Sequence, residues 1–128
     1  MLKGKISKSI TILSFSIFIF IAIFNSGNAH AKKLKIITTS TDLKSIAEYI
    51  GGNKVNVESI TKGYANPHEV DAKPSFMVKL RKADVFIRIG LDLEQWAQLL
   101  IDGARNSKIR FGSPGHIIAS VGVDLQGL

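Results

Sequence analysis

The sequence predicts an α/β fold: a mostly parallel sheet with helices on both faces. After residue 33, short β-rich runs alternate with segments in which apolar residues recur at helical spacing. A β-α-β-α-β-α order favours parallel strands joined by right-handed helical crossovers. Ligands of such sheets bind beyond the carboxyl ends of the strands. We therefore expect any functional site in the loops that leave those ends.

The first strand, helix and second strand are predicted over residues 34–60. Residues 34–38 (LKIIT) form a short β-rich run, and Ser40 or Thr41 is a suitable N-cap for a helix that follows. Gly51-Gly52 predicts the end of that helix, and the alternation over residues 55–60 predicts the second strand. One apolar helical face is expected from the spacing of Leu43, Ile46, Ala47 and Ile50.

The second half of the domain repeats this pattern after a loop over residues 61–73. Pro74 suits the first turn of a second helix, which is expected to contain Met77, Leu80, Arg81 and Ala83. Residues 84–89 form the most apolar strand, which Gly90 ends, and residues 117–121 are expected to form a fourth. Between them a third amphipathic helix is predicted from the spacing of Trp96, Leu99, Leu100 and Gly103.

Residues 1–31 have the features of a cleavable secretory signal peptide. Three lysines precede an apolar run over residues 10–24, and Ala29-His30-Ala31 supplies a small-x-small cleavage site. We therefore predict cleavage after Ala31, a periplasmic location and a single domain over residues 32–128. An uncleaved membrane anchor is the alternative, but a spanning helix needs roughly 20 apolar residues, more than this run provides.

The composition argues against several classes of protein. The chain has no cysteine, so disulfides, thiol chemistry and lipoprotein attachment are not expected. Three of the 17 Lys and Arg residues lie in the predicted signal peptide, which leaves 14 against 10 acidic residues, a net charge of +4. The remaining basic residues are scattered, without interleaved aromatic residues, so nucleic-acid binding is not expected.

His68 is the first candidate metal ligand. It follows Pro67 in the longest of the loops at the carboxyl ends of the strands. Proline fixes its own φ and restricts the preceding Asn66, so the histidine is held by a stiffened backbone. Neutral imidazole binds Zn²⁺ or Mn²⁺. From these residues alone, a solvated side chain remains the alternative.

Other polar residues have simpler interpretations. His116 lies in a Gly-rich stretch and is interpreted as a surface histidine, while Glu69 and Asp71 do not by their spacing complete a site with His68. Asp92 is expected to cap a helix that begins near Leu93, with Glu94 in its first turn.

No motif for catalysis is present in the sequence. Ser113 lies in Gly-Ser-Pro-Gly, which is not the Gly-x-Ser-x-Gly of a nucleophile elbow. Phosphate-binding Gly-x-Gly-x-x-Gly and Walker A runs are also missing. Trp96 is interpreted as a core residue. An enzyme is therefore not expected.

Four segments together resemble a known family. They are IITTSTDLKSIAEYIGG (36–52), NPHEVDAKPS (66–75), LRKADVFIRIGLDLEQW (80–96) and GARNSKI (103–109). In order and spacing they resemble the N-terminal lobe of the zinc/manganese solute-binding proteins of ABC transporters, solute-binding family 9. The resemblance runs from about Leu34 to Ser120.

The resemblance implies one lobe of a two-lobed periplasmic binding protein that captures zinc or manganese as transported ligand. It implies delivery of the metal to an ABC permease in the inner membrane, by a protein that we expect to be a monomer. His68 matches the first metal ligand, and the remaining ligands come from further along the chain and from the second lobe.

The sequence departs from the family at three places. Asn66 replaces an aspartate, His116 stands where relatives have an aromatic residue and is a weak candidate for a second ligand, and the chain ends at Leu128, before the second lobe. Two alternatives to metal capture therefore stay open. One is a truncated remnant that does not bind metal, and the other is a secreted interaction or adhesion module.

Overall fold

The computed structural model describes residues 31–124. The predicted signal peptide therefore lies outside the described residues, apart from Ala31. Within residues 31–124, no helix has the length and apolar character needed to cross a membrane. The elements in chain order are β1 (Leu34–Thr38), α2 (Thr41–Gly51), the short 3-10 helix Gly52–Lys54, β2 (Val55–Ser59), α3 (Pro74–Arg81), β3 (Val85–Arg88), α4 (Trp96–Ala104), the 3-10 helix Ser107–Ile109 and β4 (His116–Ile118).

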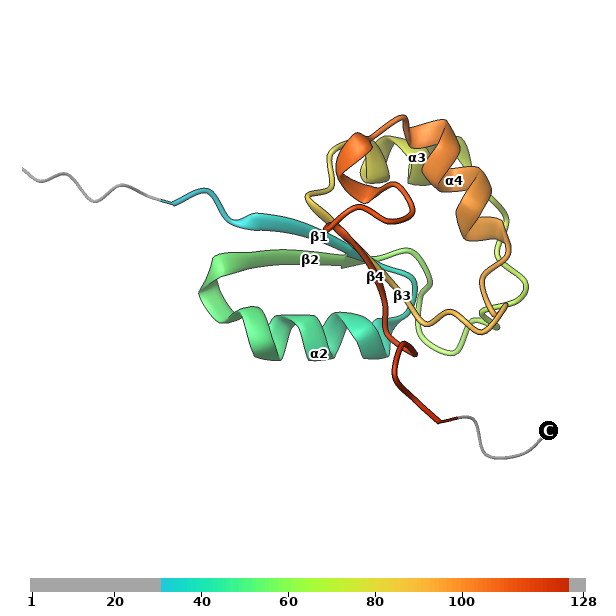
Figure 1. Ribbon diagram of the computed structural model, residues 1–128, viewed down its shortest axis with the longest axis horizontal. Helices are drawn as coiled ribbons and strands as arrows, with labels where there is room; N and C mark the ends of the chain where they lie inside the picture. The colour runs from blue at the N-terminus through green and yellow to red at the C-terminus, as the bar shows by residue number, and fades with distance from the viewer. Residues whose placement is uncertain (1–30, 125–128) are drawn as a thin grey trace, which may run out of the picture. The chain divides into compact units, whose positions relative to one another are not determined.

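The four strands form one sheet in the order β2-β1-β3-β4, and all three neighbouring pairs are parallel. Helix α2 covers one face of this sheet, whereas α3 and α4 lie together on the other (Figure 1). The predicted fold class is confirmed, because both the parallel pairing and the two helical layers are present.

The first β-α-β unit forms where its local signals predict. The Ser40 hydroxyl caps α2 by accepting a hydrogen bond from the Leu43 amide at 3.3 Å, and Gly52 ends the helix with a φ of 51°. The predicted buried face is wrong in part, because only Ala47 is buried. Ile46 is 55 % exposed and Ile50 is 79 % exposed. Helix α2 is the one helix of the described region on this side of the sheet, so its outer apolar positions lack a second layer to pack against.

The main core lies on the other face, between the sheet and the α3–α4 pair. Ile37 of β1 and Phe86 of β3 pack there against Leu80, Leu100 and Ile109, all of them fully buried. A smaller cluster of Ile36, Ala47 and Val57 fills the space under α2. The period-two alternation of the strands therefore divides their side chains between two separate clusters.

The buried face of helix α4 only partly coincides with the predicted one. Its buried positions are Ala97, Leu100, Ile101 and Ala104. Leu99, which the prediction placed inside, is 59 % exposed. Both sets of residues have helical spacing, and contact with α3 decides between them. Gly103 was placed correctly, because a Cβ there would lie 2.5 Å from the sulfur of Met77 on α3.

Several predicted boundaries shift by a few residues. Ala83 is buried but follows the end of α3. Strand β3 is shorter at each end than the predicted 84–89, and β4 covers His116–Ile118 instead of 117–121. Pro74 does occupy the first turn of α3. Short strands at a sheet edge give weak sequence signals, and the register of β4 is set by its pairing with β3.

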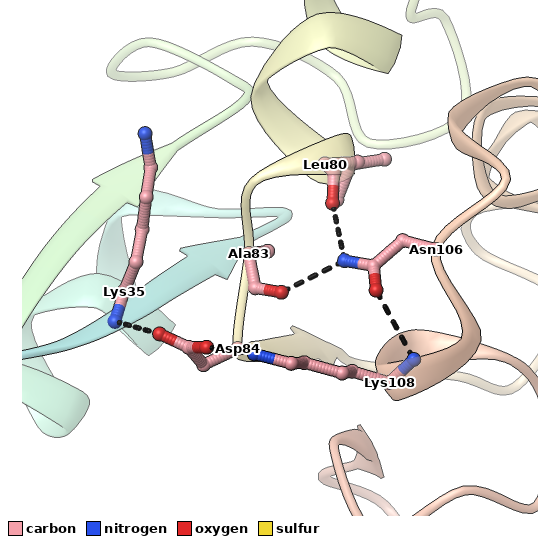
Figure 2. Close-up of polar contacts among 6 residues, drawn as sticks. All are labelled: Lys35, Leu80, Ala83, Asp84, Asn106 and Lys108. Atoms are coloured by element: carbon pink, nitrogen blue, oxygen red, sulfur yellow. Dashed lines mark hydrogen bonds and ion pairs between the residues drawn. The ribbon is translucent and has the colours of Figure 1, made fainter.

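A polar network ties α3, β1 and β3 together at the amino end of the sheet (Figure 2). The Asn106 amide group donates to the carbonyl oxygen of Leu80, in the last turn of α3, at 2.9 Å and to that of Ala83, just beyond the helix, at 2.8 Å. The Asp84 carboxylate accepts from the Lys35 amide at 3.0 Å and from the Lys108 ammonium at 2.6 Å. The Lys108 side-chain hydrogen bond is the main cause that lowers the pKa of Asp84. Residues 80–84 and 106–108, which belong to two of the four segments that resemble the family, therefore stabilise the fold.

Replacing Asn106 with alanine is expected to destabilise the domain by about 2 kcal/mol, because the carbonyls of Leu80 and Ala83, two buried residues, each lose a hydrogen bond from its amide group. The free energy of unfolding from urea denaturation of residues 32–128 measures this effect. Gln98→Ala on exposed α4 surface is the matched control and is expected to cost about 0.5 kcal/mol or less. Equal losses for the two variants would contradict this role for Asn106.

Candidate metal-binding loop

The loop that carries His68 leaves the carboxyl end of β2 and is fixed there at its first residues. Thr61 is buried, and its hydroxyl donates to the Thr39 carbonyl at 2.7 Å, beside the bond from its own amide to the same oxygen. Thr39 directly follows β1. The loop therefore starts from a fixed point between two strand ends, as expected for a site at this edge.

His68 lies in a tight turn that is held by Asn66. The Asn66 side-chain oxygen accepts from the His68 amide at 3.1 Å, and its carbonyl oxygen accepts from the Glu69 amide at 3.1 Å. An aspartate, which the family resemblance leads us to expect here, would accept the first of these bonds equally well, so an asparagine is compatible with the turn. The His68 side chain itself is exposed. Its imidazole is accessible to an incoming cation.

A second contact joins this turn to helix α4. The indole nitrogen of Trp96 donates to the Pro67 carbonyl at 2.7 Å, across 29 residues of sequence. Trp96 is half-buried and packs against the main core cluster. The interpretation of Trp96 as a core residue is therefore correct for its ring but incomplete, because its polar edge holds the loop.

Glu94 is the central residue of this edge of the sheet. Its carboxylate is 1 % exposed and accepts from the Thr39 hydroxyl at 2.6 Å and from the amides of Ile89 and Gly90, each at 2.8 Å. These donors come from the ends of β1 and β3, so one carboxylate joins two strands and the turn that follows β3. All of its partners are neutral donors.

The structure overturns the interpretation of Asp92 and Glu94 as residues of a helix N-terminus. Helix α4 begins at Trp96, and its N-cap Gln95 makes no side-chain cap. Gly90, Leu91 and Asp92 all have positive φ, at 91°, 56° and 60°. This turn reverses the chain so that Glu94 points back at the strand ends. One sequence signal could have predicted that Glu94 binds the strand ends: it lies four positions after Gly90, the glycine that ends the strand.

Glu94→Gln is expected to destabilise the domain by about 3 kcal/mol, because an amide NH₂ would face donors that now meet a carboxylate. Urea unfolding measures the loss, and Glu69→Gln on the exposed part of the loop is the matched control. If both variants unfold at the same urea concentration, Glu94 does not hold the strand ends.

His116 has a structural role within the domain. It begins β4, at the amino end of that strand, and both of its ring nitrogens are engaged. Nδ1 lies 3.1 Å from the Ile109 carbonyl, and Nε2 accepts from Arg88 Nε at 3.2 Å. The ring also packs edge-on against Phe86 and Phe111. The prediction of a surface histidine is wrong, because the ring is half-buried.

The environment of His116 favours the neutral imidazole. Burial lowers the pKa of His116 most, and the charge of Arg88 lowers it further, against the Ile109 carbonyl, which raises it. The native state therefore binds this proton less readily than the unfolded state. The stabilisation is full above the ordinary pKa of about 6.5 and is lost as pH falls through the lower native value.

Between pH 7 and 5 the free energy of unfolding is therefore expected to fall with a slope that His116→Asn reduces. Asparagine keeps an acceptor for Arg88 but does not titrate in this range. Urea unfolding at a series of pH values measures the slopes, and Gln98→Ala, at an exposed residue that does not titrate, is the control that should leave the slope unchanged. The assignment fails if His116→Asn leaves the wild-type pH slope intact.

The described residues contribute a single metal-ligand candidate from this edge. Glu69 and Asp71 are both exposed and near His68 in sequence. Within residues 31–124, no group of three or more His, Asp or Glu side chains is gathered closely enough to hold a metal ion. Among residues 31–124, the candidate ligand at this edge is therefore one accessible imidazole, that of His68.

Comparison with known proteins identifies the family of this loop and sheet. The family model of the zinc-uptake complex component A, periplasmic (ZnuA), matches residues 36–121. The chain belongs to this family. The match includes all four segments from which the resemblance was inferred, so that resemblance is confirmed. The family is one of transport solute-binding proteins and not of enzymes.

The names of the relatives mention different metals. The chain is 36 % identical over 98 residues to the iron-binding protein YfeA of Yersinia pestis, covering 75 % of this chain and 32 % of YfeA. It is 28 % identical over 101 residues to the manganese ABC transporter substrate-binding lipoprotein PsaA of Streptococcus mitis, covering 76 % of this chain and 31 % of PsaA.

A solved structure agrees with the fold. The Zn(II)-bound ZnuA-like domain of AdcA from Streptococcus pneumoniae superposes with a TM-score of 0.56 at 26 % identity, covering 73 % of this chain and 33 % of that one. In all three comparisons the chain spans about a third of the length of its relative.

Proposed function

We propose that this chain takes part in the capture of a divalent metal ion outside the cytoplasm, for delivery to an ABC importer. The observation that carries the proposal is His68, an exposed imidazole on a turn fixed by Asn66 and Trp96, in a member of a metal-uptake family. In this proposal the residues before 32 are a cleaved signal peptide and residues 32–128 form the metal-binding lobe.

The chemistry of this function is coordination. Neutral His68 donates a nitrogen lone pair to the cation, and the fixed loop lowers the cost of holding the imidazole in place. Zinc or manganese is the proposed cargo, and the names of the relatives extend the range to iron. The proposed partner is the membrane permease of the importer, to which a monomer delivers the ion.

The expected strength of binding follows from the number of ligands. Four-ligand structural zinc sites bind with about 10–16 kcal/mol, so each ligand contributes about 3 kcal/mol. One imidazole then gives a dissociation constant in the millimolar range. Tight capture needs further ligands, which we propose come from a second lobe, since the relatives are about three times longer than this chain.

A second candidate function is a secreted interaction module that needs no metal. The exposed side chains of Ile46, Tyr49 and Ile50 on α2 support it, because they offer an apolar surface to another polypeptide. A truncated remnant would share this surface. Neither alternative requires the imidazole of His68 to respond to metal, so one measurement separates them from metal capture.

Zn²⁺ added to residues 32–128 is expected to shift the ring signals of His68 in two-dimensional NMR at millimolar concentration. The ring signals of His116 are the internal control and should not move, because both of its nitrogens are already engaged. His68→Ala should abolish the response. A Zn²⁺ response that is equal at both histidines, or that survives His68→Ala, would contradict the proposal.

A further inference from the structure

The peptide unit between Pro67 and His68 is held from both sides. Its carbonyl oxygen accepts from the Trp96 indole at 2.7 Å, and its amide donates to the Asn66 side chain at 3.1 Å. Fixing both polar groups of one peptide fixes the plane of that peptide. The Cα of His68 is the next atom of that plane, so its position is fixed as well.

The two holders differ in how they are supported. Asn66 belongs to the same exposed turn as His68, so its bond does not tie the turn to the rest of the domain. Trp96 is the first residue of α4, and its ring packs against the core cluster that includes Ala97 and Leu100. Two residues earlier, Glu94 is anchored to the ends of β1 and β3. The Trp96 hydrogen bond is thus the contact that fixes the position of His68 relative to the core and the ends of β1 and β3.

We propose that Trp96 is the positioning residue of the His68 loop. The proposal rests on the metal-capture function given above and deepens it. An indole N–H is a donor only, so it selects the orientation of the Pro67 carbonyl without competing for a cation. Groups that orient a metal ligand typically change metal affinity by 10–100-fold. The bond here acts through the backbone, and a roughly three- to tenfold effect is expected.

Trp96 also provides a direct probe, because it is the one tryptophan in the sequence. Its indole N–H gives a single, unambiguous NMR signal whose hydrogen exchange reports the bond to Pro67. In the wild-type domain the exchange is expected to be at least tenfold slower than in an unstructured peptide. Exchange as fast as in the peptide would overturn the proposal without any variant being made.

Trp96→Phe is the matching variant, since it keeps an aromatic ring in the core and removes the donor. In the absence of metal, the backbone order parameters of residues 66–69 are expected to fall from rigid to flexible values. In a Zn²⁺ titration of residues 32–128, the initial slope of the His68 shift is expected to fall three- to tenfold. Unchanged order parameters would refute the positioning role, even if zinc binding were altered.

Two controls separate positioning from general destabilisation. Leu100→Val lowers the packing of the same helix without touching the loop, and should leave the order parameters of residues 66–69 and the titration slope unchanged. Gln98→Ala, on the exposed surface of α4, leaves all contacts of the loop in place and should behave as wild type. If Leu100→Val loosens the loop as much as Trp96→Phe, the effect is one of stability and the proposal fails.

The proposed function can fail separately. If the wild-type His68 signals do not respond to Zn²⁺, metal capture through this residue is refuted. The metal-free order parameters and the indole exchange still decide whether Trp96 positions the loop.

Discussion

The hydrogen bonds to the buried Glu94 carboxylate are the interactions that hold together the loops at the carboxyl ends of the strands. A charge taken out of water is costly unless every lone pair facing the protein is used. Here two backbone amides and a hydroxyl supply that compensation, and they come from the ends of β1 and β3. Thr39 provides one of the three donors, and its carbonyl oxygen in turn accepts a hydrogen bond from the Thr61 hydroxyl, in the loop after β2. One side chain therefore joins three loops into a single edge.

The sequence predicted the fold well because its signals are local. The Ser40 cap, the glycine after α2 and the proline at the start of α3 act within a few residues of themselves, and all three appear where they were expected. The orientation of α4 was predicted less well. Two sets of apolar residues on that helix satisfy the same spacing, and the choice between them depends on α3.

Of the candidate site, the sequence predicted the metal-ligand candidate His68 but not the residues that hold its loop. His68 could be singled out from a Pro-His pair in a loop. The residues that support it could not, because Trp96 and Glu94 act on atoms 29 and 55 positions away, at Pro67 and Thr39. His116 shows the reverse error, since its neighbours in sequence suggested an open stretch while Arg88 and two phenylalanine rings enclose it. Long-range contacts of this kind leave no periodic trace.

The turn between Gly90 and Glu94 restricts how this part of the chain can vary during evolution. Three consecutive residues with positive φ bring the carboxylate back to the strand ends. One inserted or deleted residue would rotate or withdraw it, so the length of this turn is fixed even though the side chains of Leu91 and Asp92 are exposed. The stretch between Thr61 and Asn66 is different. It is anchored at its ends, and its exposed middle can gain or lose residues at little cost. Insertions that change access to His68 can therefore accumulate in that stretch, while the turn that supports the histidine keeps its length.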